Sequence, residues 1–424
     1  MLSHKKIFSK FNQLEKKYYY DKSFEISKNH LHSLIWNKNF IFPKFTLLRF
    51  LTNSILFILS IISIFLCKIR NISVANYFIV HRNKSGLYDF RSDYVLKEYD
   101  FRKSLNIIRC PSFIDSIKSY FIYPNVIFFL SIDYFNSSFF YRKKNLRNNY
   151  EILHKKEKKN FNLIKKIFHF LQIRKFISID DQRVIQVFLK VCNELDIRSF
   201  GYMHYKFSKF IVGIKYLCFD NFLVWSDYFK KKLIEVNKNY KYKKILISGF
   251  HDKNYQKKNK GNKINILYII DLDLKFKSTS SLLKKLNQKK KINLYVKLRP
   301  QVAETMWEQF CIKQNINYFK FENLDKVNRL IRIDYFIGNI STAILEAPLY
   351  RAMPLKIISE NDFADDLIKD KVVKKIRNFK DIMKITRNRP SKKEVNDLLY
   401  KVWGKKRYKA YVIKNILNKY VQLN

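Results

Sequence analysis

Glycine and proline are both scarce in this chain, with seven of each among 424 residues. A collagen-like repeat needs glycine at every third position, and flexible linkers are rich in glycine and proline, so both kinds of chain are excluded. Cysteine is rare as well: the five cysteines are an odd number, and no Cys-x-x-Cys pair occurs. The sequence therefore encodes neither a disulfide framework nor a zinc ribbon, and its thiols suit a reducing compartment.

The signature motifs of several large enzyme classes are also missing. The sequence contains no GxGxxG, no GxxxxGKS/T, no HExxH and no GxSxG. These motifs supply the phosphate loops of dehydrogenases and P-loop enzymes, the zinc ligands of metallopeptidases and the nucleophile of α/β-hydrolases. Their absence argues against all four classes.

Acidic residues are few: 35 Asp and Glu stand against 84 Lys and Arg, which gives a formal net charge of +49. A field of this size attracts nucleic acid or an anionic membrane surface. The basic residues are spread along the whole chain, however, and Lys, Asn, Ile, Phe and Tyr, which have A/T-rich codons, are all abundant. No zinc-finger spacing, RNP-type motif or basic-region heptad accompanies the charge. We therefore do not expect nucleic-acid binding to be the main function.

The sequence has one long apolar run, at residues 50–67, with 18 positions that carry no charge. That length permits a transmembrane helix. Five hydroxyl or amide residues interrupt the run, and basic residues flank both ends, so the positive-inside rule gives no orientation. Three interpretations stay open: a spanning helix, a helix that lies on a membrane face with snorkelling basic ends, or a buried packing helix. A multi-span transporter is excluded, because the mean hydropathy is −0.29.

From residue 74 onward, short apolar runs alternate with helical stretches. Between two expected strands, residues 182–197 carry apolar side chains at spacings of four, three and four, which predicts a helix that packs on a sheet. The repeated strand–helix–strand order predicts parallel sheets and an α/β fold. The expected strands are Asn76–His81, Asn106–Arg109, Asn125–Ile132, Phe176–Ile179, Arg198–Met203, Asn221–Trp225, Lys244–Ser248, Ile264–Ile270, Ile292–Leu298, Asp334–Gly338 and Leu355–Ile358.

A polar, basic stretch at residues 255–263 (YQKKNKGNK) divides this pattern in two and is the best linker candidate. We expect a basic helical N-terminal extension at 1–73, a Rossmann-like domain at 74–254, and a second Rossmann-like domain with terminal helices at 264–424. Open parallel sheets bind ligands at the carboxyl ends of their strands. The site is therefore expected between the two domains.

The stretch from Gly338 to Pro348 (GNISTAILEAP) suits a phosphate. A buried strand is expected to end at Gly338, directly before Asn339, and a helix to follow, so that free backbone N–H groups and the positive helix end meet there. Ser341 and Thr342 add hydroxyl donors. Glu346, one turn after Thr342, is placed to reach a ribose diol. An ordinary helix N-cap is the alternative for the same residues.

Two cations close the strand at residues 292–298. Lys297 and Arg299 lie on the same side of an extended chain, and Pro300 ends the strand. Convergent cations suit a diphosphate. The alternative is chance, because a chain this basic places Lys and Arg at many strand ends.

Three further groups are expected at strand ends. His204 can act as a general base, or it can bond to backbone as a structural histidine. Asp180 and Asp181 precede a helix and are either a base or an N-cap pair. Asp271 and Asp273 are spaced to hold a divalent metal, or they belong to a turn.

At this point the residues resemble a known family. The runs DDQRVIQVFLKVCNELDIRSFGYMH, KYLCFDNFLVWSDYFKKKLIE and KKILISGFHD, followed by VKLRP and GNISTAILEAPLYRAMPLKII, resemble bacterial surface and capsular polysaccharide glycosyltransferases of the GT-B fold. The order of the motifs is similar to that in CDP-glycerol glycerophosphotransferases. The resemblance covers roughly residues 175–360 and implies an α/β fold of two Rossmann-like, GT-B-like domains, the first for the acceptor and the second for the nucleotide donor.

The resemblance implies transfer of a sugar from a nucleotide-activated donor to a surface polysaccharide or a lipid-linked glycan. Lys297, Arg299, Ser341 and Thr342 would hold the donor phosphates, and Glu346 the ribose. The cationic pocket would stabilise the departing phosphate, so that no metal and no further cofactor are needed.

The histidine motif of the family implies that His204 is the base, with Asp180 or Asp181 as the second choice. Two positions depart from the family pattern. The His-Gly pair reads His204-Tyr205 here, and the histidine of the Lys-x-His-Pro motif is Arg299. The first departure weakens the assignment of the base, and the second removes an acid but keeps a cation for phosphate.

The expected partners are a nucleotide-sugar donor, a glycan or lipid-linked acceptor and an anionic membrane surface. The expected location is cytoplasmic, peripheral or anchored at the inner face of the cytoplasmic membrane. Three alternatives remain open: a glycerophosphotransferase of the CDP-glycerol type, a nucleotide-sugar epimerase of the same fold, and a non-enzymatic basic protein that binds membranes or polyanions.

Overall fold

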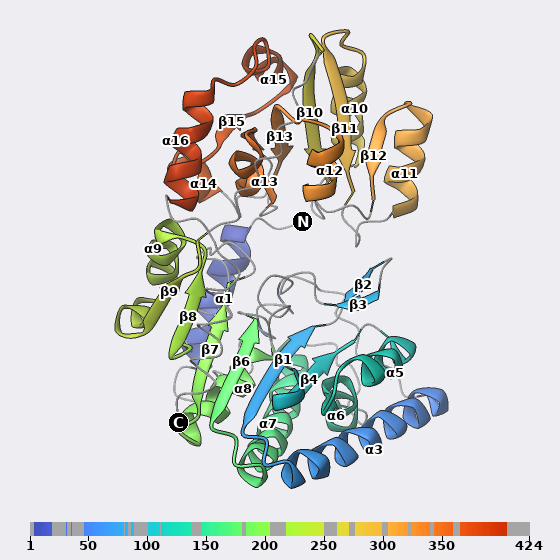
Figure 1. Cartoon of the computed structure of the whole chain (residues 1–424), viewed down its shortest axis with the longest axis vertical. Helices are drawn as coiled ribbons and strands as arrows, with labels where there is room; N and C mark the ends of the chain where they lie inside the picture. Colours follow the sequence, from blue (N-terminus) through green and yellow to red (C-terminus); the bar gives the residue numbers. More distant parts are fainter. Residues whose placement is uncertain are drawn as a thin grey trace.

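The computed structural model describes most of the chain and contains two parallel β-sheets, each with helices on its faces (Figure 1). The residues that it describes are 4–18, 31, 35, 46–79, 81–83, 86–88, 101–110, 112–137, 146–179, 184–203, 218–249, 261–270, 276–298, 304–320, 324–339, 343–358 and 365–404.

The first sheet has seven strands in the order β5-β4-β1-β6-β7-β8-β9, and every neighbouring pair is parallel. Its strands are β1 (Val74–Ile79), β4 (Leu105–Arg109), β5 (Val126–Phe128), β6 (Lys175–Ile179), β7 (Arg198–Tyr202), β8 (Asn221–Val224) and β9 (Lys244–Ile247). A short antiparallel pair, β2 (His81–Asn83) and β3 (Gly86–Tyr88), follows β1.

The second sheet has six parallel strands in the order β12-β11-β10-β13-β14-β15. Its strands are β10 (Ile264–Ile269), β11 (Ile292–Lys297), β12 (Asn317–Phe319), β13 (Tyr335–Gly338), β14 (Met353–Ile357) and β15 (Lys374–Ile376). Both faces of the central strand β10 are covered, since all of its residues are buried. The two sheets confirm the expected α/β fold class with two Rossmann-like, GT-B-like domains.

The helices connect the strands and cover the sheets, as the βα repetition requires. Those in the first half are α1 (His4–Tyr18), α3 (Leu47–Ile69), α5 (Phe113–Ile122), α6 (Phe129–Ser137), α7 (Leu146–Phe170), α8 (Ile185–Glu194) and α9 (Asp227–Val236). Those in the second half are α10 (Phe276–Asn287), α11 (Glu304–Lys313), α12 (Leu324–Leu330), α13 (Ala343–Glu346), α14 (Asp365–Lys369), α15 (Phe379–Ile385) and α16 (Lys392–Trp403). Short 3₁₀ helices lie at Phe101–Lys103, Lys238–Tyr242 and Ala347–Tyr350.

The strand expected at 76–81 is shifted, because β1 spans Val74–Ile79 and His81 begins β2, and two other expected elements differ in type from the structure. The strand expected at 125–132 ends at Phe128, and helix α6 begins at Phe129. Residues 126–130 are all apolar because the strand and the beginning of the helix are both largely buried, and such a run has no period that separates helix from strand. The helix expected after the GNIST motif is α-helical only from Ala343 to Glu346. It then tightens to a 3₁₀ turn containing Pro348, which has no N–H to donate.

The two domains are joined by a buried contact between α9 and the end of α16. The rings of Trp225 and Trp403 stack with centroids 5.3 Å apart. The Ser226 hydroxyl donates a hydrogen bond to the carbonyl of Val402. At the rim of this contact, the Tyr228 hydroxyl donates to the Asp370 carboxylate at 2.8 Å. This contact links the two halves of the chain, and we call it the tryptophan contact.

Candidate functional site

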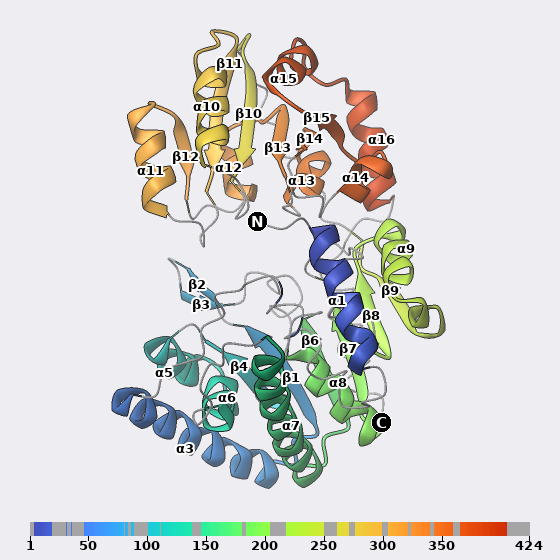
Figure 2. The same ribbon diagram turned by 180° about the vertical axis from the view of Figure 1, so that it is seen from behind.

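The carboxyl ends of both sheets point toward the middle of the molecule, so that they face each other (Figures 1 and 2). In the second sheet the strand order reverses between β10 and β13: the chain moves outward through β11 and β12, then returns to the other side of β10. The loops that follow two such strands separate, and this leaves room for a ligand. The loop after β13 contains the GNIST motif.

The first sheet has its own reversal, between β1 and β6. The chain moves from β1 through β4 and β5 and then returns to β6 on the other side. Strand β6 ends at Ile179, directly before the two aspartates, and its neighbour β7 ends at Tyr202, two residues before His204. The sequence motifs therefore leave the sheets at the reversal points or beside them, on the edges that face each other.

Most of the predicted site residues themselves fall outside the residues that the structure describes, so their roles stay predictions. These are His204, Asp180, Asp181, Arg299, Ser341, Thr342, Asp271 and Asp273, and residues 255–260 of the expected linker. The described residues of the predicted set are Lys297, Gly338, Asn339 and Glu346.

Gly338 and Asn339 lie where the donor motif was expected, at the carboxyl end of β13. Gly338 is paired in register with Lys356 of the neighbouring strand β14. Asn339 is fully buried, and its side-chain oxygen accepts a hydrogen bond from the Lys356 ammonium at 3.4 Å. The strand end at the start of GNIST thus lies beside a buried lysine.

Sequence reasoning missed Lys356. Its side chain is fully buried, which is rare for lysine. The strand MPLKI offered one signal, a lysine inside an otherwise buried apolar run. At this position the positive charge lies beside the reversal point and next to the motif that suits a phosphate.

Lys297 lies at the carboxyl edge, as expected, but its ammonium is turned to the backbone. It donates to the carbonyl of Leu298 at 2.7 Å and to that of Lys320 at 3.1 Å. These bonds tie the end of β11 to the segment that follows β12. In this structure Lys297 therefore organises the edge on which the donor phosphates are expected.

Glu346 is the last residue of the short helix α13, and Leu345 beside it anchors that helix to Trp403. The indole N–H of Trp403 donates to the carbonyl of Leu345 at 2.8 Å. Trp403 is also one of the two rings of the tryptophan contact. The helix that follows GNIST is thus fixed by the same side chain that joins the domains.

The five cysteines are free and buried. Burial raises the pKa of the Cys67 thiol to about 12, and that of Cys311 to about 12 as well. A buried protonated thiol is a poor nucleophile and a poor metal ligand. Among the described ranges of the chain, no group of three or more His, Cys, Asp or Glu side chains is placed to hold a metal.

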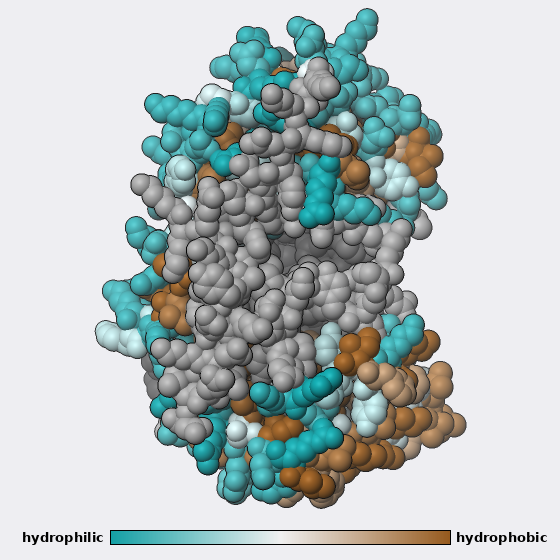
Figure 3. Space-filling model, in the orientation of Figure 1, coloured by the Kyte–Doolittle hydropathy of each residue, from teal (hydrophilic) through white to brown (hydrophobic). Residues whose placement is uncertain are grey.

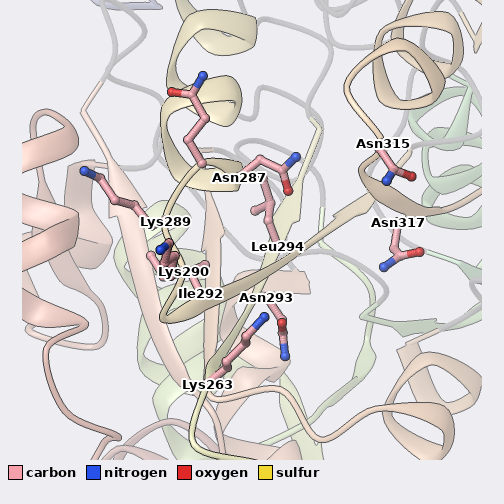
Figure 4. A pocket seen from close by; sticks show the side chains of 10 residues that line it. Lys263, Asn287, Lys289, Lys290, Ile292, Asn293, Leu294, Asn315 and Asn317 are labelled. Carbon is pink, nitrogen blue, oxygen red and sulfur yellow. The ribbon is translucent and has the colours of Figure 1, made fainter.

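A shallow hollow of about 280 Å³ lies at the opposite edge of the second sheet (Figure 4). It lies at the amino ends of β10, β11 and β12, and its lining includes Lys263, Lys289 and the amides of Asn293 and Asn317. Parallel sheets bind ligands at their carboxyl ends, so this hollow is on the wrong edge for the donor.

No protein-family model matches the sequence, and no curated protein does. Among solved structures, the chain is similar to S. aureus MnaA in complex with UDP, with 11% identity, a TM-score of 0.49 and coverage of 83% of this chain and 97% of that one. It is also similar to Anabaena HepE in complex with UDP-glucose, with 10% identity, a TM-score of 0.46 and coverage of 82% and 99%. A UDP-N-acetylglucosamine 2-epimerase gives 9% identity and a TM-score of 0.45 over 82% and 95%. Since all three scores lie below 0.5, the architecture of this chain rests on its own strand order.

Proposed function

We propose that this chain is a glycosyltransferase that moves a sugar from a nucleotide-activated donor to a glycan or lipid-linked acceptor. One observation carries the proposal: the loops with the transferase-like motifs follow strands at or beside the two reversal points, on edges that face each other. That placement suits a two-substrate reaction, because each sheet can hold one substrate at its carboxyl edge.

The proposed reaction is a displacement at the anomeric carbon of the sugar. The acceptor hydroxyl attacks, the bond from that carbon to the phosphate oxygen breaks, and the nucleotide leaves with the bonding electrons. The hydroxyl proton goes to a base, for which His204 is the first choice and Asp180 or Asp181 the second. The charge that develops on the leaving phosphate is stabilised by nearby cations and N–H groups.

The buried lysine of β14 adds a further cation to this account. Lys356 lies beside Asn339, at the beginning of the loop expected to hold the donor phosphates. A cation in a buried setting interacts with phosphate more strongly than one in water. We assign Lys356 to the donor side, where it holds Asn339 in position and adds positive charge.

A product assay tests the proposed function and separates it from the two related enzymes. The purified chain is incubated with nucleotide-activated sugars, and separately with CDP-glycerol, each with and without a lipid-linked glycan extract. We expect a free nucleotide and a glycosylated acceptor, with no reaction of the sugar when the acceptor is missing. Mass spectrometry of the nucleotide and of the acceptor after the reaction is the measurement.

Two results of that assay would contradict the proposal. Isomerised nucleotide-sugar in the absence of acceptor would identify an epimerase. Phosphoglycerol on the acceptor, with no sugar transfer from any donor, would identify a glycerophosphotransferase. The variant His204→Ala tests the assignment of the base. We expect acceptor glycosylation to fall by about 100-fold or more if His204 is the base.

A further inference from the structure

Helix α3 has a buried side that packs into the first domain and an opposite side that is exposed. The buried face consists of Leu56, Ser60, Ser63 and Cys67 at spacings of four, three and four. The Ser60 hydroxyl accepts a hydrogen bond from the N–H of Phe128 at 3.0 Å. It also donates to the carbonyl of Leu56 at 2.7 Å. One side of α3 is therefore built into the domain, against strand β5.

The opposite side of α3 is apolar and exposed along its full length. Its residues repeat at the same spacing of four and three: Leu51, Ile55, Ile58, Ile62, Phe65 and Ile69. A helix at the surface of a soluble domain normally carries polar residues on its outer side. By length and composition α3 is the one helix in the described part of the chain that qualifies for crossing a membrane.

Two neighbouring helices extend this exposed face. Helix α5 packs beside α3 and exposes Ile114, Phe121 and Ile122, and Phe121 is 82% exposed. The exposed ring of Phe170, at the end of α7, meets Phe65 edge to face at 6.3 Å. Figure 3 shows this surface as a brown area along the lower edge of the molecule, where α3 and α5 lie in Figure 1. We call the exposed residues of α3 and α5, with Phe170, the apolar face.

The charges around the apolar face are all positive among its described residues. Arg49 and Lys68 lie near the two ends of α3, which has no acidic residue. Lys118 lies on the exposed side of α5, between Ile114 and Phe121, and the one acidic residue of α5, Asp115, is buried. Lysine and arginine can place an aliphatic stem on apolar surface while the charged end reaches polar groups.

We propose that the apolar face docks this protein on an anionic lipid bilayer, with α3 lying in the plane of the interface. The apolar side chains enter the boundary between headgroups and acyl chains, and the basic residues meet lipid phosphates. The inference concerns a surface of the first domain and does not depend on the proposed reaction.

Two alternatives for the apolar face, a second copy of the chain and a membrane-spanning α3, fit less well. A second copy of the chain on a two-fold axis would bring this face against itself, and its basic residues would repel one another. A spanning arrangement would pull α3 away from the domain and leave the N–H of Phe128 without Ser60. An anionic bilayer satisfies both the apolar and the basic side chains without either cost.

Flotation with lipid vesicles tests this proposal on the full-length chain. The variant Ile58→Ser/Phe65→Ser/Phe121→Ser removes three exposed apolar side chains from the face. The matched control, Met306→Ser/Ile312→Ser/Leu330→Ser, removes three exposed apolar side chains from the second domain. Vesicles of phosphatidylcholine alone are compared with vesicles that also contain phosphatidylglycerol. Melting temperatures confirm that both variants fold.

We expect the wild type and the control variant to float with the anionic vesicles and to bind neutral vesicles more weakly. The face variant should lose at least about tenfold in vesicle affinity, because the apolar area that enters the bilayer is gone. Equal flotation of the face variant would overturn the proposal and leave only the general positive charge as the cause of binding. A wild-type dimer that this variant converts to a monomer, with no vesicle binding by either, would overturn it in favour of a second copy.

Discussion

Replacing Trp403 by alanine is expected to lower the free energy of unfolding by about 3–5 kcal/mol, the usual cost of deleting a large buried aromatic side chain. The substitution removes the stacking on Trp225 and the hydrogen bond to the Leu345 carbonyl. Urea unfolding followed by circular dichroism measures the loss. Because Leu345 belongs to the helix after GNIST, we also expect nucleotide affinity to fall.

The conservative variant Trp403→Phe separates the contribution of the ring stacking from that of the hydrogen bond to Leu345. Phenylalanine keeps a ring against Trp225 but cannot donate to Leu345, so the stability loss should shrink while part of the loss in nucleotide affinity remains. An alanine variant that unfolds at the wild-type urea concentration would show that the tryptophan contact does not join the domains in solution.

Replacing Lys356 by methionine is expected to weaken nucleotide binding by about tenfold to hundredfold, as removal of a hydrogen bond from a charged group usually does. Methionine has a similar length and remains apolar in a buried strand, so the fold should persist. The ammonium group beside Asn339 is lost, and so is its 3.4 Å hydrogen bond to the Asn339 side chain. Isothermal titration with the tightest-binding nucleoside diphosphate measures the effect.

Lys374→Met is the matched control, since it removes the same charge from the same sheet. Lys374 begins the neighbouring strand β15 and pairs with Glu394 at 2.8 Å on the surface. Surface pairs of this kind contribute little to stability. Equal losses of affinity in both lysine variants would mean that the net charge of the protein, rather than the position of Lys356, governs nucleotide binding.

The fold could be predicted from sequence wherever short apolar runs alternated with stretches whose apolar residues recur at helical spacing. The expected strands 106–109, 176–179 and 264–270 match β4, β6 and β10 to within about one residue at each end. The run 125–132 could not be divided, because apolar residues continue from strand β5 into the beginning of helix α6. Strand β12 escaped prediction: it has three residues, and pairing to β11 rather than its own pattern defines it.

The site was predictable only as far as the strand ends that carry it. Gly338 and Asn339 lie at the carboxyl end of β13, as their motif indicated. The contribution of Lys356 depends on which strands become neighbours, and the link from Trp403 to Leu345 joins residues 58 positions apart. The lysine inside the apolar strand MPLKI marks Lys356 as unusual, but neither contact partner can be read from the local sequence, so only the folded chain brings these residues to the donor edge.

The most direct test of the central claim is a thermal-shift panel of UDP, GDP, CDP, CMP and dTDP, with and without Mg²⁺ or EDTA. It compares the wild type with Ser341→Ala/Thr342→Ala. A ligand that binds only the folded state raises the melting temperature. We predict that one nucleotide stabilises the wild type in EDTA and that the double variant loses this effect. If no nucleotide shifts the melting temperature while heparin and anionic vesicles do, the chain is a polyanion-binding protein and the transferase account is contradicted.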